Sequence, residues 1–139
     1  MSAQIRLATT ADIPELEKLD QWPGKEKWQR KIYCEEVIVL EVDNKLAGLL
    51  RFCVIWTTVP FIELIYIKAE HQKKGYSKLM LEFLCDHLKK LGYVALLSSS
   101  QTNEVTPQAW HVHMGFKTNG IIENIDDDNI GEIVYRLLL

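Results

Sequence analysis

A basic, glycine-bearing loop between an apolar run and an amphipathic run is the stretch of this sequence most suited to chemistry. Residues 61–68 are rich in β-branched and aromatic types, which predicts a mostly buried strand. Residues 72–77 form a polar loop with Gly75 near its centre, and from residue 78 apolar side chains recur at helical spacing. The first N–H groups of a helix lack intrahelical partners, and the helix dipole is positive there. The stretch therefore predicts an anion site.

Glu63 is the first candidate for acid–base chemistry, because a carboxylate within an apolar strand is costly to bury unless it is paired. One interpretation is a general base with a raised pKa. The other is an outward-facing side chain paired with Arg51 or a lysine. The sequence leaves both open.

His111 is the second candidate, within a short helix expected over residues 106–114. With an ordinary pKa of about 6.5, it could be a tuned imidazolium acid, a neutral hydrogen-bond donor or a residue without a catalytic role. His111 and His113 project from different sides of a helix, since ligands on one face need spacings of three or four. We therefore expect no metal site.

The remaining chain predicts the elements that position these residues. Strands are expected at 5–7, 37–42, 46–56, 61–68, 94–97, 116–123 and 132–138, and helices at 11–19, 25–36, 78–91 and 106–114. Leu79, Met80, Phe83, Leu84, Leu88 and Leu91 are expected to form one buried helix face, with Ser77 at its N-cap. No linker or repeat interrupts the order, which predicts a single α+β domain over residues 1–139.

Composition excludes several classes of function. The chain has 139 residues and a net charge of −3 with scattered basic residues, which argues against nucleic acid as a partner. The three cysteines lack C-x-x-C spacing, which favours a reducing compartment. The N-terminal residues form neither an apolar signal sequence nor a membrane span, so a cytoplasmic protein without membrane partners is expected.

Two motifs resemble those of the GNAT acetyltransferase superfamily. Gln72-x-x-Gly75-x-Ser77 is similar to the family's [RQ]-x-x-G-x-[GA] loop, with serine at the last small position. The segment from Asn103 through 109–116 (AWHVHMGF) is similar to the family's N…A-x-x-[FL]-Y-x-K-x-G-F motif. In this second motif the alanine adjoins the aromatic residue, and His111 replaces the usual tyrosine.

The resemblance implies the GNAT fold, a mixed and mostly antiparallel sheet with helices on both faces. In that fold the fourth and fifth strands run parallel and splay apart, and acetyl-coenzyme A (acetyl-CoA) enters between them. Glu63 would be the base and His111 would face the departing sulfur. The residues implied in cofactor binding are Ile65, Tyr66, Ile67, Gln72, Lys73, Lys74, Gly75, Tyr76, Ser77, Lys78, Asn103 and Trp110.

The activity implied is direct transfer of acetyl from acetyl-CoA to a primary amine of a small molecule or peptide. The alternatives are a catalytically silent acetyl-CoA-binding module and a protein-interaction adaptor. Trp28, Tyr33 and Trp56 could line an acceptor pocket, although core packing is favoured, and the acidic run 126–128 could attract a cationic acceptor. Homodimers are frequent in the family, but the sequence decides neither the oligomeric state nor the acceptor.

Overall fold

The computed structural model describes residues 2–126 and 128–139. In chain order its elements are β1 (Ala3–Leu7), η1 (Thr10–Asp12), α1 (Ile13–Leu19), α2 (Lys25–Tyr33), β2 (Val37–Val42), β3 (Lys45–Ile55), β4 (Val59–Ile67), η2 (Ala69–His71), α3 (Tyr76–Lys90), β5 (Ala95–Gln101), α4 (Val105–His113), β6 (Lys117–Ile122) and β7 (Glu132–Leu138). The predicted order of strands and helices is confirmed.

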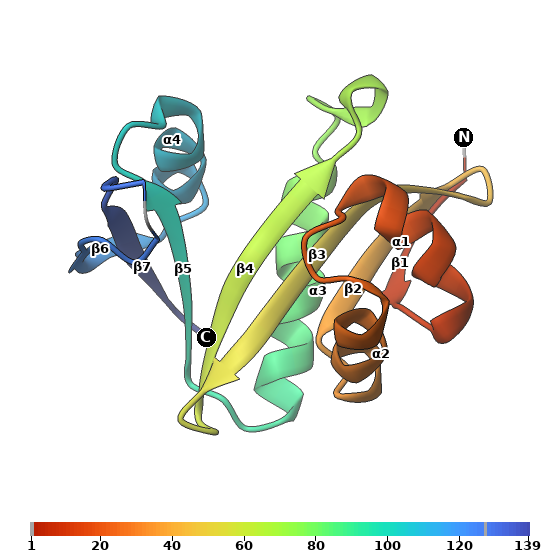
Figure 1. Cartoon of the computed structure of the whole chain (residues 1–139), viewed down its shortest axis with the longest axis horizontal. Coiled ribbons are helices and arrows are strands. Elements are labelled where there is room, and N and C mark those ends of the chain that lie inside the picture. Colours follow the sequence, from red (N-terminus) through yellow and green to blue (C-terminus); the bar gives the residue numbers. More distant parts are fainter. Residues whose placement is uncertain (1, 127) are drawn as a thin grey trace.

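The strands form one mixed sheet in the order β1-β2-β3-β4-β5-β7-β6. Neighbouring strands are antiparallel except β4 and β5, which are parallel. Within the described residues, β4 and β5 pair only at Phe61 and Leu97. Beyond this point the two strands diverge, and Figure 1 shows the resulting V between them. The expected parallel, splayed pair is confirmed.

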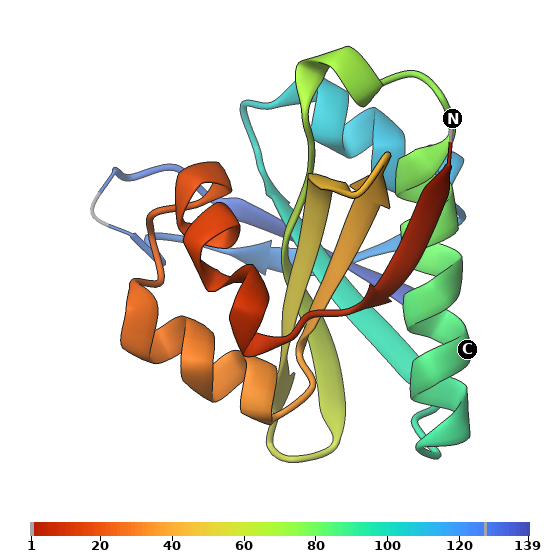
Figure 2. The ribbon, with the colours of Figure 1, turned by 90° about the vertical axis from the view of Figure 1, so that its right-hand side faces the viewer.

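Helices cover both faces of the sheet, as Figures 1 and 2 show. On one face, α1 and α2 bury Leu16 and Trp28 against β2 and β3. On the other, α3 buries Met80, Leu84 and Leu88 in the larger core cluster. These apolar side chains leave water completely, which stabilises the fold and fixes α3 against the sheet.

Several local predictions are wrong in detail. Helix α3 begins at Tyr76 with Gly75 as its N-cap, so Ser77 lies within the first turn. Leu79 and Leu91 are 47% and 60% exposed, whereas Leu81, outside the predicted face, is buried. Strand β5 extends past Leu97 to Gln101. The last difference matters for function, because the added residues 98–101 border the V.

Trp28 is a core residue with no exposed surface, whereas Tyr33 and Trp56 are 89% and 86% exposed. The preference for core packing is therefore confirmed for Trp28 alone. Of the acidic run, Asp127 lies outside the described residues, while Asp126 and Asp128 belong to the exposed β6–β7 connection. Among the helices of the described chain, none is long and apolar enough to cross a membrane.

Candidate functional site

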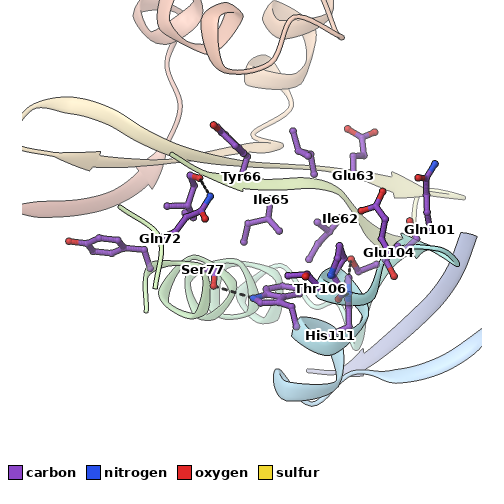
Figure 3. Close-up of a pocket in the computed structure, with 18 of the residues that line it drawn as sticks. Ile62, Glu63, Ile65, Tyr66, Gln72, Ser77, Gln101, Glu104, Thr106 and His111 are labelled. Atoms are coloured by element: carbon purple, nitrogen blue, oxygen red, sulfur yellow. Dashed lines mark hydrogen bonds between the residues drawn. The ribbon is translucent and has the colours of Figure 1, made fainter. Parts of the chain in front are cut away.

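The V between β4 and β5 opens into a cleft of about 700 Å³. Residues 62–67 of β4 and 98–101 of β5 form its two long walls. The loop before α3 closes one end, and α4 contributes Pro107, Trp110 and His111 to the wall. Figure 3 shows Gln72 and Ser77 toward one end and Gln101 and Glu104 toward the other, with Ile62 and Ile65 between them. The cleft is elongated and has chemically different ends.

The end next to α3 has the features of an anion site. Gly75 has φ of 84°, a left-handed conformation that favours glycine, and it directs the chain into the first turn of α3. That turn contains no acidic residue, so its free N–H groups keep the partial positive charge of the helix end. The side chain of Gln72 donates a 2.8 Å hydrogen bond to the Ile67 carbonyl, which fixes the loop to the end of β4. Lys73, also at this end, adds positive charge.

A hydrogen bond joins α3 to α4 across this end of the cleft. Trp110 Nε1 donates to Ser77 Oγ over 3.1 Å, as Figure 3 shows. The contact fixes the indole beside the helix start. Both residues line the cleft.

The structure brings most of the predicted site residues together. Those that line the cleft are Glu63, Ile65, Tyr66, Ile67, Gln72, Lys73, Gly75, Tyr76, Ser77, Trp110 and His111. The other three, Lys74, Lys78 and Asn103, are exposed and lie outside the cleft wall as the described residues form it. Lys78 instead borders a groove between α3 and the end of α4, to which β7 contributes Leu137.

Glu63 lies at an irregularity in β4. Arg51 of β3 pairs with Leu64 and Phe52 pairs with Ile62, which leaves Glu63 as the extra residue of a β-bulge. Bulges redirect side chains, and they frequently occur beside active sites. Figure 3 shows Glu63 on the opposite side of β4 from His111. The two predicted acid–base residues therefore do not contact each other.

The Glu63 carboxylate accepts from two cations through the same oxygen, Oε1. Lys31 Nζ and Arg51 Nη1 each lie 3.0 Å away. Burial acts to raise the pKa of Glu63, but the hydrogen bonds and charges of Lys31 and Arg51 outweigh it and hold the pKa below its ordinary value. The expected raised pKa is wrong. The ion-pair interpretation describes this geometry, with Lys31 as the lysine.

These contacts extend into a network of five charged side chains. Arg51 Nε bonds Asp20 Oδ2 at 2.8 Å, and Lys31 Nζ lies 3.3 Å from Glu36 Oε1. Three carboxylates and two cations leave this network with one net negative charge.

His111 is only 4% exposed, and both ring nitrogens have partners inside the protein. Nδ1 lies 2.7 Å from the Pro107 carbonyl oxygen, and Nε2 lies 2.7 Å from Ser98 Oγ. A carbonyl can only accept, so Nδ1 carries the proton of the neutral ring and Nε2 accepts from the serine hydroxyl. Burial lowers the pKa of His111, although the Pro107 hydrogen bond opposes the effect. The imidazolium acid and the direct donor to sulfur, both expected as options, do not fit this arrangement.

Sequence comparison supports the resemblance with an independent finding. Residues 7–116 match the family model described as the acetyltransferase (GNAT) family. The chain belongs to the GNAT acetyltransferase family. Among proteins with curated functions, none matches the sequence.

Solved structures share the GNAT fold along the whole chain. The yncA protein of Salmonella typhimurium with its cofactor acetyl-CoA has a TM-score of 0.85 and 14% identity, covering 100% of this chain and 95% of its own. The PaiA N-acetyltransferase of Thermoplasma acidophilum in complex with coenzyme A has a TM-score of 0.83 and 17% identity, covering 100% of both chains. The ribosomal-protein-S18-alanine N-acetyltransferase of Escherichia coli has a TM-score of 0.76 and 20% identity, covering 99% of this chain and 94% of its own. The predicted fold is confirmed.

Sequence reasoning missed several residues that line the cleft of this GNAT domain. Ser98 and Ser100 project from β5 and are buried, and Ser100 Oγ lies 2.8 Å from the Tyr135 hydroxyl. Glu104 and Glu132 line the end away from α3. Burial raises the pKa of Glu132, and the nearby charges of Asp126, Glu104 and Asp128 act in the same direction. The serine run 98–100, continuing an apolar strand, was the available signal for the first two.

The described part of the chain contains no cluster of three or more histidine, cysteine, aspartate or glutamate side chains arranged to hold a metal ion.

Proposed function

We propose that this protein is an acetyl-CoA-dependent N-acetyltransferase that acts on a primary amine. The observation that supports this most strongly is a single cleft with an anion-binding helix start at one end and carboxylates at the other. A nucleotide thioester and a cationic amine are the two substrates whose charges match those ends. Family membership and the coenzyme A complexes of structural neighbours agree with the proposal.

The residues present fit acetyl-CoA. The left-handed Gly75 leaves open space where a Cβ would stand, since none of the described atoms lies within 4 Å of that position. Free N–H groups at the start of α3 would bind the pyrophosphate, and Lys73 would add charge. The diverging backbone of β4 from Ile65 to Ile67 would pair with the amides of the pantetheine arm, as an added strand does. Bound acetyl-CoA supplies an acetyl group activated as a thioester.

The amine would reach the cleft from the carboxylate end. Glu63, Glu104 and Glu132 contribute negative charge there, which attracts an ammonium ion and raises its local concentration. Because its pKa is lowered, Glu63 is a weak proton acceptor. We therefore assign Glu63 an electrostatic role, in which its carboxylate attracts the positively charged amine of the acceptor. Direct attack by the neutral amine then needs no covalent intermediate on a cysteine.

The test combines binding with turnover. Purified protein is titrated with coenzyme A by calorimetry, and thiol release from acetyl-CoA is then followed over a panel of diamines, aminoglycosides, amino acids and peptides. We expect measurable coenzyme A binding, amine-dependent thiol release and a product heavier by one acetyl group. Tight binding without turnover on any amine would instead identify a silent binding module. Absence of binding would overturn both, and would favour an adaptor.

A further inference from the structure

The hydroxyl of Ser98 stands at the apex of the V. Leu97 is the last β5 residue paired with β4, so Ser98 is the first residue along the diverging edge. Its side chain faces α4 and lines the cleft, yet the residue is only 2% exposed. Ser98 and His111 both line this part of the cleft, and Ser98 Oγ lies 2.7 Å from His111 Nε2.

Behind Ser98, the imidazole is oriented by three kinds of contact. The Pro107 carbonyl fixes the proton on Nδ1, the Tyr135 ring stacks on it at 4.1 Å between centroids, and the rings of Trp110 and Phe116 lie against its edge or face. Of the residues that contact the imidazole, Tyr135 has an ionisable side chain, and its hydroxyl is hydrogen-bonded to Ser100 Oγ. The remaining Nε2 lone pair accepts from Ser98. This serine is polarised by a neutral base held in one tautomer.

We propose that Ser98 is a catalytic residue of the acetyl transfer and that it relays a proton between the substrates and His111. When the amine nitrogen forms its bond to the acetyl carbon, its surplus proton passes to Ser98 Oγ while the Ser98 proton passes to His111 Nε2. The carbon–sulfur bond then breaks, and its electron pair leaves with sulfur. His111 returns a proton to Ser98, and Ser98 gives its proton to the sulfur, so the products are the N-acetyl amine and the free thiol.

This relay rests on the proposed function and gives a role to features that the remaining site leaves unexplained. A lowered pKa keeps His111 neutral and able to accept a proton at neutral pH, which is the opposite of what an imidazolium acid needs. Glu63 is held by two cations on the opposite side of β4 and is poorly suited to the same task. One histidine can serve both proton transfers because the same proton is accepted and then returned.

Ser98→Ala is the decisive variant, and Ser100→Ala is its matched control. Both serines project from β5, are nearly buried and hydrogen-bond an aromatic or imidazole partner, but only Ser98 contacts His111. We expect Ser98→Ala to lower kcat/KM by about 100-fold or more, in the range of general acid–base catalysis, with coenzyme A affinity unchanged. Ser100→Ala should change kcat/KM far less, and Ser98→Thr, which keeps the hydroxyl, should recover most of the activity.

The pH profile separates a relay from a merely structural serine. The rate per neutral amine should fall as pH drops through the pKa of His111, below its ordinary 6.5, and this acidic limb should be absent in Ser98→Ala. Equal losses in Ser98→Ala and Ser100→Ala, or an unchanged acidic limb, would overturn the relay alone. No thiol release from the unmodified enzyme with any amine would overturn the proposed function together with the relay.

A spectroscopic measurement tests the relay without turnover. In ligand-free protein labelled with 15N-histidine, NMR should find His111 neutral at pH 7 with the proton on Nδ1 and an unprotonated, hydrogen-bonded Nε2. In Ser98→Ala the Nε2 resonance should move toward that of a free acceptor nitrogen, whereas in Ser100→Ala it should not. A proton found on Nε2 in the unmodified protein would contradict the direction of the relay.

Discussion

Replacement of Gly75 by alanine tests the anion-binding end of the cleft most directly. Gly75 adopts φ of 84° and ψ of 6° as the N-cap of α3. An L-residue with a Cβ is disfavoured there by about 1–2 kcal/mol, so the variant either retains the strain or shifts its backbone. A shift would turn the first N–H groups of α3 away from the point where they converge.

Gly92 provides a matched control at the opposite end of the same helix. It has φ of 90°, and no described atom lies within 4 Å of its hypothetical Cβ, as at Gly75. Both alanine variants should therefore lose similar stability, which we expect as a fall in Tm of about 3–8 °C for a chain of this size. Gly92 lies outside the cleft wall formed by the described residues, so Gly92→Ala should bind coenzyme A normally.

The two variants should differ in coenzyme A affinity. Losing one hydrogen bond from a backbone N–H to a phosphate oxygen costs about 1.5–3 kcal/mol, which corresponds to a roughly 10- to 150-fold rise in Kd for Gly75→Ala. Calorimetric titration of both variants and the unmodified protein measures the difference, and thermal unfolding verifies that each is folded. If Gly75→Ala loses as much stability as Gly92→Ala but still binds coenzyme A with unchanged affinity, this loop is not the phosphate-binding site.

Three further results are expected. Glu63→Gln should raise KM for cationic acceptors several-fold. Because ion pairs with Lys31 and Arg51 lower the pKa of Glu63 in the folded protein, the variant should also be less stable than the unmodified protein above about pH 4.5. This stability difference should shrink as pH falls through the lowered pKa, and its absence would show that the ion pairs contribute nothing. Trp28→Ala should lower the free energy of unfolding by about 3–5 kcal/mol in urea titrations, since the side chain is fully buried, and a loss under about 1 kcal/mol would contradict its core role. Coenzyme A affinity should decrease steadily between low and high salt, because Lys73 is exposed and its attraction is screened, and a salt-independent Kd would argue against phosphate binding.

The strand–loop–helix from Val59 to Lys90 could be predicted from sequence because its signals are local. A run of β-branched and aromatic residues, a glycine and a 3.6-residue period each occupy a few neighbouring residues and need no knowledge of the remaining fold. The helix face was harder to assign. Leu79 and Leu81 are two residues apart and so lie on nearly opposite sides of the helix. Packing against the sheet buries Leu81 and leaves Leu79 exposed.

The ionisation states of the site could not be predicted, because they depend on residues far apart in sequence. Lys31 reaches Glu63 from α2, and nothing in the apolar run around Glu63 indicates that partner. The same limit applies to His111, whose serine partner lies 13 residues earlier on a different element. Sequence indicated which side chains could titrate, but only tertiary contacts determine the direction of each pKa.

The contrast between Glu63 and His111 explains how one cleft can separate substrate attraction from proton transfer. A carboxylate held by two cations stays charged, so it can attract an amine but accepts a proton poorly. A buried imidazole stays neutral, so it can accept a proton but exerts little electrostatic force on an approaching ammonium ion. If the roles were reversed, the charged histidine would oppose entry of the ammonium ion. The electrostatic arrangement thus favours proton transfer through Ser98 at the apex, where the two strands diverge and both substrates could meet.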